Sequence, residues 1–522
     1  MFNQNHSHLA ARREQISRIV VTAQQMRNIE ERIFTKGMPV AALMEKVAGL
    51  VTRRIIELYP LSQVSRIGIL VGPGHNGGDA LVVARELHFQ GYQVAVCSPF
   101  SKLKDLTSQH AQYVKSLEII VHESLEPLAE CDLFIDGLFG FGLERSLSSP
   151  VDQIVNQLNE WSQPVVSIDL PSGLHTDTGE VLGTAVQATY TFCLGLWKLG
   201  LLQDQALDYV GAAELIDFDI PLTDIQAILE TPKIQRITPQ SAIATLPLKR
   251  SPVTHKYKQG HLLLICGSRR YTGGAILTGL GARASGVGML SIAVPESIKP
   301  LLSTQLPEAL IIGCPETESG AIAQLQLPEI DLSSFDAIAC GPGLTVDAKP
   351  ILQEVLDSDR PLVLDADGLN ILAQMGTTQT LQHRQASTVL TPHAGEFKRL
   401  FPDIVDPTKD RIAAVRAATE QSGAVVLLKG ARTAIAQADC VWVNPDSTPA
   451  LARGGSGDVL TGLLGGLIAQ ATSKDIPLVE IVSSAAWWHS QAGILAADER
   501  TEMGVDAFTL AKYLMSVVSR FS

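Results

Sequence analysis

Two glycine-rich loops, one in each half of this chain, have the composition needed to bind and transform an anionic substrate. The first is GPGHNGGD over residues 72–79, and the second is RGGSGD over residues 453–458. Glycines leave backbone N–H groups free to face an anion, and a following helix adds its positive N-terminal end. The aspartate that ends each loop can act as an acid, a base or a cation ligand. We therefore expect two active sites on one polypeptide.

The elements that position these loops are short apolar runs that end in glycine or an acidic residue. RIGILVGPG, YQVAVCSP, CDLFIDGLFG and PVVSIDLPSG occur in the first half, and HLLLICGS, DAIACGPGL, PLVLDADGLN and AVVLLKGART occur in the second. Their alternation with helix-length segments predicts parallel sheets with ligands beyond the carboxyl ends of the strands. The strand rhythm is lost in the proline-containing stretch 217–252. We predict two three-layer α/β/α domains, residues 1–228 and 229–522.

Composition narrows the class of partner. The chain has 522 residues, 46% of them hydrophobic, and a formal net charge of −13, which argues against nucleic acid and against an anionic membrane surface. The seven cysteines are scattered without a CxxC pair, so we expect them to be reduced core residues. No secretion signal or spanning segment is recognisable. We expect a cytoplasmic enzyme with small-molecule substrates.

Four polar residues follow predicted strands in the first half: Asn76, Asp136, Asp169 and Ser172. Their amide, carboxylate and hydroxyl oxygens suit a simple cation such as an alkali metal or Mg²⁺. A second carboxylate is then available for proton transfer. Each aspartate alone could instead cap a loop, but both lie at strand ends where ligands of α/β sheets bind.

Five segments of the first half together resemble NAD(P)H-hydrate epimerase, a Rossmann-like domain: LMEKVAG, GPGHNGGDA, DGLFGFGLERS, DLPSGLHTDTG and LGLWKLGL. The resemblance implies a potassium ion held by Asn76, Asp136 and Ser172. It also implies that Asp169 contacts the hydrated ring and serves in proton transfer. The residues implied to bind the dinucleotide are His75, Asn76, Gly77, Gly78, Asp79, Gly140, Phe141, Gly142, Leu143, Glu144, Arg145, Ser146 and Asp169.

In the second half, LARGGSGDVLTGLLGG places glycines before an apolar helix, so free N–H groups can neutralise a phosphoryl group in transfer. Asp458 is then placed to accept a proton from a substrate hydroxyl. The segment 429–433 and His393 follow other predicted strands, and Lys429 offers a point charge for a nucleotide phosphate. No Walker sequence is present, so a P-loop enzyme is excluded.

The second half resembles ADP-dependent NAD(P)H-hydrate dehydratase, which has a ribokinase-like three-layer fold. The segments that carry the likeness are HKYKQGHLLLICGS, YTGGAILTGLGARASGVG, GPGL, TPHAGE, KGART and GGSGDVLTG. The resemblance implies catalysis by Asp458 and Mg²⁺ bridging the phosphates of ADP or ATP. Implied contacts to the hydrated dinucleotide are Gly274, Gly343, His393 and Asp458. Implied nucleotide contacts are Lys429, Gly430, Ala431, Arg432, Thr433 and Gly457.

Together the two resemblances predict a bifunctional repair enzyme for hydrated NADH and NADPH, and we expect a homo-oligomer. The first domain would interconvert the R and S epimers, and the second would dehydrate the S form at the expense of ADP. Two alternatives stay open. The second domain alone is compatible with a ribokinase-like vitamin or sugar kinase. The first could be a non-catalytic dinucleotide-binding module, because His75 and Ala80 depart from the family's usual GNNGGDG loop.

Overall fold

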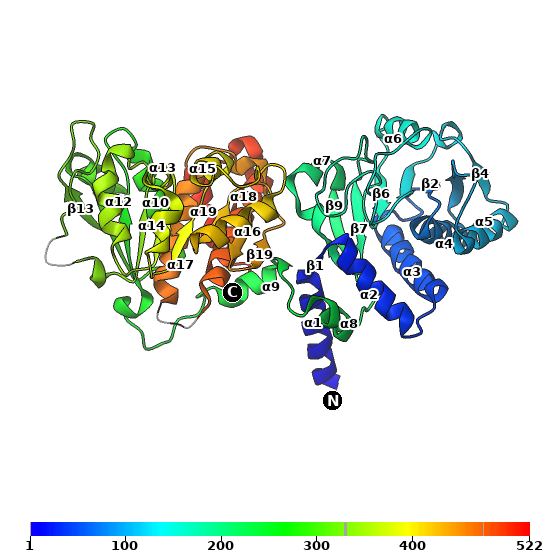
Figure 1. The fold of residues 1–522 in the computed structure, drawn as a ribbon, viewed down its shortest axis with the longest axis horizontal. Helices are drawn as coiled ribbons and strands as arrows, with labels where there is room; N and C mark the ends of the chain where they lie inside the picture. Colours follow the sequence, from blue (N-terminus) through cyan, green and yellow to red (C-terminus); the bar gives the residue numbers. More distant parts are fainter. Residues whose placement is uncertain (1, 328–330, 473, 475, 522) are drawn as a thin grey trace. The chain divides into compact units, whose positions relative to one another are not determined.

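The computed structural model describes residues 2–327, 331–472, 474 and 476–521, and the chain divides into two compact units, Met1–Ile234 and Gln235–Ser522. The expected division at residue 228 falls within the last helix of the first unit. Both units combine helices with a largely parallel sheet, so the predicted α/β class is confirmed (Figure 1). No helix among the described residues is long and apolar enough to cross a membrane.

The first unit contains a seven-stranded sheet of order β4-β3-β2-β5-β6-β7-β9, in which every neighbouring pair is parallel. A parallel pair, β1 and β8, stands apart. Its strands are β1 (Val20–Val21), β2 (Arg66–Val71), β3 (Gln93–Cys97), β4 (Ile120–His122), β5 (Leu133–Gly137), β6 (Val165–Ile168), β7 (Tyr190–Leu194), β8 (Trp197–Lys198) and β9 (Ala212–Ile216). Its helices are α1 (Phe2–Arg18), α2 (Ala23–Thr35), α3 (Val40–Leu58), α4 (His75–Phe89), α5 (Asp105–Ser116), α6 (Val151–Asn159), α7 (Leu207–Val210) and α8 (Leu222–Leu229).

The second unit contains a ten-stranded sheet of order β10-β19-β18-β17-β16-β15-β14-β11-β12-β13. The pairs that join β13, β12, β11, β14, β15, β16 and β17 are parallel, whereas β17–β18 and β18–β19 are antiparallel. Its strands are β10 (Ile234–Arg236), β11 (His261–Ile265), β12 (Met289–Pro295), β13 (Leu310–Cys314), β14 (Ala337–Cys340), β15 (Leu362–Leu364), β16 (Thr388–Leu390), β17 (Val425–Leu428), β18 (Ala434–Gln437) and β19 (Cys440–Val443). Its helices are α9 (Pro239–Thr245), α10 (Thr272–Ser285), α11 (Lys299–Gln305), α12 (Lys349–Leu356), α13 (Asp367–Met375), α14 (Thr377–Gln382), α15 (Ala394–Leu400), α16 (Arg411–Ser422), α17 (Ser456–Ala471), α18 (Leu478–Arg500) and α19 (Ala507–Val518).

The strand order reverses once inside each parallel sheet. In the first unit the chain proceeds from β2 outward through β3 and β4, and then returns to place β5 on the other side of β2. In the second unit the chain proceeds from β11 outward through β12 and β13, and then returns to place β14 on the other side of β11. Because such crossovers are right-handed, the connecting helices on either side of the reversal cover opposite faces of the sheet. The reversal opens a crevice at the carboxyl ends of the two central strands.

Alternating side chains of the central strands of the first unit fill two separate cores. Ile67 and Ile69 pack in the cluster that contains α3 and α4, whereas Leu70 and Phe134 pack with α6 on the other face. This alternation is what a period of two residues in a strand requires. All seven cysteines are free, and six of them are buried, as their apolar surroundings in the sequence predicted.

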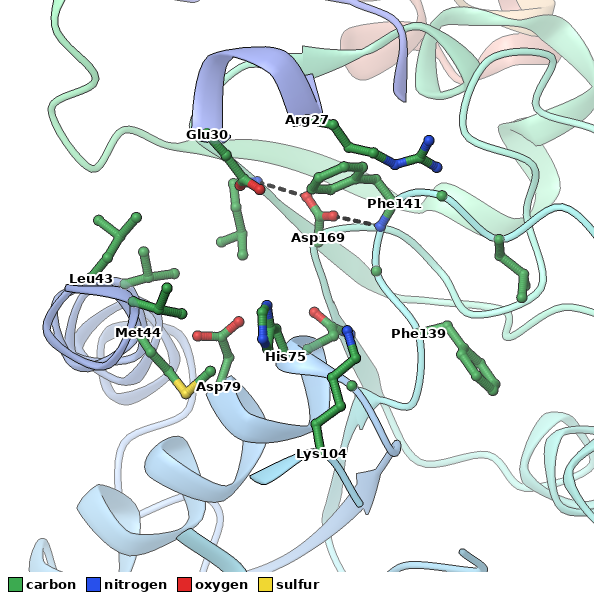
Figure 2. Close-up of a pocket in the computed structure, with 18 of the residues that line it drawn as sticks. Arg27, Glu30, Leu43, Met44, His75, Asp79, Lys104, Phe139, Phe141 and Asp169 are labelled. Atoms are coloured by element: carbon green, nitrogen blue, oxygen red, sulfur yellow. Dashed lines mark hydrogen bonds between the residues drawn. The ribbon is translucent and has the colours of Figure 1, made fainter. Parts of the chain in front are cut away.

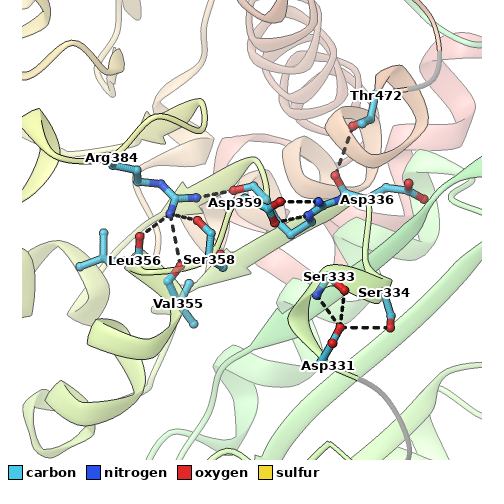
Figure 3. A network of polar contacts seen from close by, with 11 residues as sticks. Asp331, Ser333, Ser334, Asp336, Val355, Leu356, Ser358, Asp359, Arg384 and Thr472 are labelled. Carbon is cyan, nitrogen blue, oxygen red and sulfur yellow. Dashed lines mark hydrogen bonds and ion pairs between the residues drawn. The ribbon is translucent and has the colours of Figure 1, made fainter.

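A polar network around Arg384 ties the segment between α12 and β15 to the start of β16 (Figure 3). Arg384 donates from Nη1 to the carbonyl oxygens of Leu356 (2.5 Å) and Ser358 (2.6 Å), and from Nε to Thr388 Oγ1 (2.9 Å). The guanidinium therefore satisfies carbonyls that the end of α12 leaves without a helical partner. The network lies at the amino ends of these strands, so it holds the sheet at the edge opposite to the crevice.

The first glycine loop is packed backbone against backbone. Gly72 donates its N–H to the Gly137 carbonyl oxygen over 3.1 Å, which joins the loop after β2 to the end of β5. A Cβ at Gly77 would lie 1.9 Å from the Gly72 carbonyl oxygen, whereas a Cβ at Gly74 would meet nothing within 4 Å. The turn from β2 into α4 can therefore form only with glycine at position 77.

We predict that Gly77→Ala lowers the free energy of unfolding of the first unit by about 1–3 kcal/mol, because the new methyl group forces the turn away from Gly72. Gly74→Ala is the matched control and should change it by less than about 0.5 kcal/mol. Differential scanning calorimetry of the full chain measures both shifts. Equal effects of the two substitutions would contradict the packing argument.

Candidate active sites

A cavity of about 440 Å³ lies in the first unit, beyond the carboxyl ends of β2, β5 and β6 (Figure 2). The predicted site residues that line it are His75, Asn76, Asp79, Gly140, Phe141, Gly142, Leu143 and Asp169. Helices α2 and α3 close the cavity with Glu30, Leu43 and Met44. The loops after three different strands thus meet in one place, as the strand-end pattern predicted.

The remaining predicted dinucleotide contacts do not line this cavity. Gly78 packs instead against α3, where an added Cβ would lie 2.6 Å from Met44 Cε. Glu144, Arg145 and Ser146 are exposed, and Glu144 lies 3.8 Å from Arg27, which does line the cavity. Glu144, Arg145 and Ser146 therefore lie on the surface of the loop after β5, next to the cavity.

Of the three residues predicted to hold potassium, Asn76 lines the cavity, whereas Asp136 and Ser172 are buried and hydrogen-bonded to each other. The Ser172 hydroxyl donates to Asp136 Oδ1 over 2.6 Å and its backbone N–H to Oδ2 over 2.8 Å. Burial raises the pKa of the Asp136 carboxyl, although these hydrogen bonds oppose the shift. Asn76 Nδ2 is buried without a hydrogen-bond partner. Turning the amide would bury an oxygen instead, and amide, carboxylate and hydroxyl oxygens are the types of ligand that a potassium ion takes.

A buried ion pair fixes Asp169. Lys198 Nζ lies 2.6 Å from Asp169 Oδ1, and both side chains are almost fully buried. Phe141 donates its N–H to Oδ2 over 2.9 Å. Burial alone would lower the pKa of Lys198, but the Asp169 carboxylate raises it. Asp169 itself has a φ of +71°, a conformation that costs a non-glycine residue energy and that the surrounding contacts must hold.

Two further carboxyls face the same cavity. Burial raises the pKa of Glu30 to about 7, with Lys198 opposing and Asp169 adding to the shift. Burial, with the charges of Asp169 and Glu30, raises the pKa of Asp79 well above its ordinary value. Partial burial and the nearby Lys104 ammonium lower the pKa of His75. The cavity therefore holds groups that exchange protons near neutral pH.

The second site also contains a lysine paired with a buried aspartate. Lys429 Nζ lies 2.7 Å from Asp365 Oδ1 and 3.9 Å from Glu396 Oε2. Thr461 of α17 donates its hydroxyl to Asp365 Oδ2 over 2.7 Å. Burial alone would lower the pKa of Lys429, but Asp365 and Glu396 raise it. The cation is thus held at the N-terminus of α17, where a Cβ at Gly457 would lie 3.3 Å from Nζ.

Asp458 lies at the crevice between the loops that follow β11 and β14. A Cβ at Gly274 would lie 3.4 Å from Asp458 Oδ2 and 3.7 Å from the Gly343 nitrogen, so these three predicted residues are neighbours. Burial raises the pKa of Asp458 to about 7; Asp365 adds to this shift and Lys429 opposes it. A carboxyl with this pKa is suited to accept a proton at neutral pH.

Three other predicted residues of the second unit, His393, Gly430 and Thr433, lie in the loops that follow β16 and β17. His393 caps α15 by accepting the Gly395 N–H at Nδ1 over 3.0 Å, and its side chain is exposed. A Cβ at Gly430 would lie 2.3 Å from the Arg411 guanidinium, which supports the loop from below. Thr433 donates its hydroxyl to the Gly430 carbonyl oxygen over 3.1 Å. These contacts hold residues 430–433 as a tight turn directly after Lys429.

Comparison with known proteins covers both units. Residues 40–200 match the family model described as YjeF-related protein N-terminus, and residues 262–516 match that of NAD(P)H-hydrate dehydratase. The bifunctional NAD(P)H-hydrate repair enzyme of Synechocystis sp. is 56% identical over 500 residues, covering 95% of this chain and 94% of the relative. The chain belongs to the family of bifunctional NAD(P)H-hydrate repair enzymes.

Another member of the family, from Thermosynechococcus vestitus, is 50% identical over 96% of this chain and 97% of the relative. Among solved structures, an ADP/ATP-dependent NAD(P)H-hydrate dehydratase from Bacillus subtilis, co-crystallised with ATP and Mg²⁺, is 34% identical. That structure covers 55% of this chain and 98% of its own length, with a TM-score of 0.47.

Sequence reasoning assigned no role to four of the charged groups found at these sites: Glu30, Lys198, Lys104 and Asp365. Lys198 carried a readable signal, because a lysine inside the apolar run LGLWKLGL must find a buried partner. Asp365 carried a weaker one, since it ends the strand-like run PLVLDADG. Glu30 lies on the helical face of α2, and nothing in the sequence separates it from the exposed Glu31 beside it.

Proposed function

We propose that the first unit interconverts the R and S epimers of hydrated NADH and NADPH, and that the second dehydrates the S form at the expense of ADP or ATP. The observation that carries this proposal is the match to bifunctional repair enzymes across both units. Two sites with different proton-transfer groups support a division into two reactions. An epimerase would supply the dehydratase with the isomer that it can use.

In the first unit, we assign Asn76, Asp136 and Ser172 to a potassium ion, whose charge would help to hold and polarise the substrate. The orphaned amide of Asn76 supports this assignment. Asp169 would contact the hydrated ring, and Lys198 would keep its carboxylate oriented toward the cavity. Glycine at position 140 lets the loop after β5 lie close to both residues, because a Cβ there would lie 3.0 Å from Asp169 Oδ2 and 3.2 Å from Asn76 Oδ1.

In the second unit, Asp458 would take the proton from the ring hydroxyl as the phosphoryl group of the nucleotide moves to that oxygen. Backbone N–H groups at the start of α17 and Lys429 would stabilise the charge on the phosphoryl group. The ring nitrogen's lone pair then expels phosphate, and loss of a proton from the neighbouring carbon restores the dihydronicotinamide. Mg²⁺, when bound, would neutralise the nucleotide phosphates. Among the described residues no three histidine, cysteine or acidic side chains form a metal-ligand group, so nucleotide oxygens and water would supply most of its ligands.

The test is recovery of absorbance near about 340 nm, where dihydronicotinamides absorb, from a mixed-epimer NADH hydrate preparation with K⁺, Mg²⁺ and ADP or ATP. Full recovery, faster than spontaneous epimerisation allows, is the expected result. Recovery of the S fraction alone would leave the first unit as a non-catalytic binding module. A stable phosphorylated product without recovery would favour the vitamin or sugar kinase instead.

Asp458→Asn should lower the rate of dehydration by about 10²–10⁴-fold, because it removes the proton acceptor, and should leave epimerisation unchanged. In the unaltered chain, kcat/KM for dehydration should fall about tenfold per pH unit below pH about 7 and level off above it, since only ionised Asp458 accepts the proton. Stopped-flow absorbance on the S epimer gives both values. A flat pH profile would contradict the assignment of Asp458.

Lys104 provides a prediction about substrate binding. It lines the cavity beside His75 (Figure 2), and among the described residues its ammonium makes no hydrogen bond or ion pair. An unpaired cation at the N-terminal end of α4 should attract the phosphates of the dinucleotide. Lys104→Ala should raise KM for epimerisation about 5- to 20-fold and weaken its salt dependence, with kcat nearly unchanged. Lys102→Ala, an exposed neighbour outside the cavity, should leave KM within about twofold.

A further inference from the structure

Two carboxyls approach the first cavity from opposite walls without a protein partner. Glu30 extends from α2 and Asp79 from α4, and both point into the space between these helices (Figure 2). Within the described part of the chain, neither carboxyl makes a hydrogen bond or an ion pair. Asp169 differs from both, because its two oxygens already receive the Lys198 ammonium and the Phe141 N–H.

Leaving two partly buried carboxyls unpaired costs free energy unless a ligand uses them. The cost is reduced by protonation, and burial raises the pKa of both groups, that of Glu30 to about 7. Burial thus favours the protonated form of both carboxyls, and Glu30 changes between its protonated and ionised forms near neutral pH. One wall can donate a proton while the other accepts one.

Epimerisation of a hydrated dihydronicotinamide inverts the ring carbon that carries the hydroxyl and adjoins the ring nitrogen. The nitrogen lone pair can form a C=N bond as the C–O bond breaks, and the departing oxygen needs a proton to leave as water. A second water then adds to the opposite face of the same carbon and loses a proton, while the electrons of the C=N bond return to nitrogen. This sequence requires an acid on one face of the ring and a base on the other.

We propose, on the basis of the epimerase activity proposed above, that Glu30 and Asp79 are this acid–base pair and act on opposite faces of the ring. For one epimer Asp79 protonates the leaving hydroxyl and Glu30 deprotonates the entering water. For the other epimer the two residues exchange roles. Asp169, held by Lys198 at the side of the ring, stabilises the positive charge that develops on the ring nitrogen.

The experiment follows the R epimer in H₂¹⁸O with the full chain and K⁺, without nucleotide so that dehydration cannot occur. Chromatography measures inversion, and mass spectrometry measures oxygen exchange. Each inverted molecule should carry one ¹⁸O, at a rate far above the protein-free control. Glu30→Gln should lower kcat for inversion about 10²–10³-fold with KM within about threefold. The matched control, Glu31→Gln, alters an exposed side chain on the same helix and should change neither value.

A second variant separates catalysis from folding. Glu30→Ala should lose inversion and regain part of it when formate is added, because a small carboxylic acid can occupy the space left by the side chain. Nucleotide-dependent dehydration of the S epimer should be unchanged in every variant. Inversion without ¹⁸O, or normal kcat in Glu30→Gln, would overturn the proposal. Absence of inversion in the unaltered chain would instead overturn the epimerase function itself.

Discussion

The reversal of strand order is the constraint on which both sites depend. Parallel strands place all their carboxyl ends at one edge, and right-handed crossovers send the connecting helices to opposite faces on either side of the reversal. The loops after β2 and β5 therefore separate at one point, and the loops after β11 and β14 do so in the second unit. At the first crevice the backbones of the loops after β2 and β5 lie in contact, because Gly72 and Gly77 carry no side chain.

Each crevice is organised electrostatically by a lysine and a buried aspartate. Lys198 with Asp169 and Lys429 with Asp365 have Nζ to oxygen distances of 2.6 and 2.7 Å. Removing one partner would leave a buried charge uncompensated, so neither residue of such a pair can be replaced alone without a loss of stability. In both units a residue at or beside the pair has a positive φ: Asp169 has a φ of +71°, and Ala366, next to Asp365, has a φ of +49°. The pairs thus hold strand-end loops in conformations that the local sequence disfavours.

The fold and much of each site followed from the sequence because their signals are local. Apolar runs that end in glycine or aspartate predict strands, and the carboxyl ends of parallel strands must share an edge, so the loops that carry Asn76 and Asp169 could be expected to meet at one cavity. Glu30 could not be found this way, because it reaches the cavity from a helix that precedes the sheet. Its difference from Glu31 arises only when α2 packs over the crevice. The same holds for Lys104, because the sequence does not show that none of the described carboxylates forms an ion pair with it.

The two reactions need different sets of acidic groups, and at both sites burial adjusts the pKa of the carboxyls. Burial raises the pKa of both Glu30 and Asp458 to about 7. Burial, with the charges of Asp169 and Glu30, also raises the pKa of Asp79, and the two unpaired carboxyls would together supply the donor and the acceptor that a reversible inversion requires. Asp458 instead adjoins Lys429 and the N-terminus of α17, where a phosphoryl group supplies the driving force and one proton acceptor is sufficient. A symmetric pair of carboxyls suits a reaction that runs both ways, and a single base beside a cation suits one driven by phosphoryl transfer.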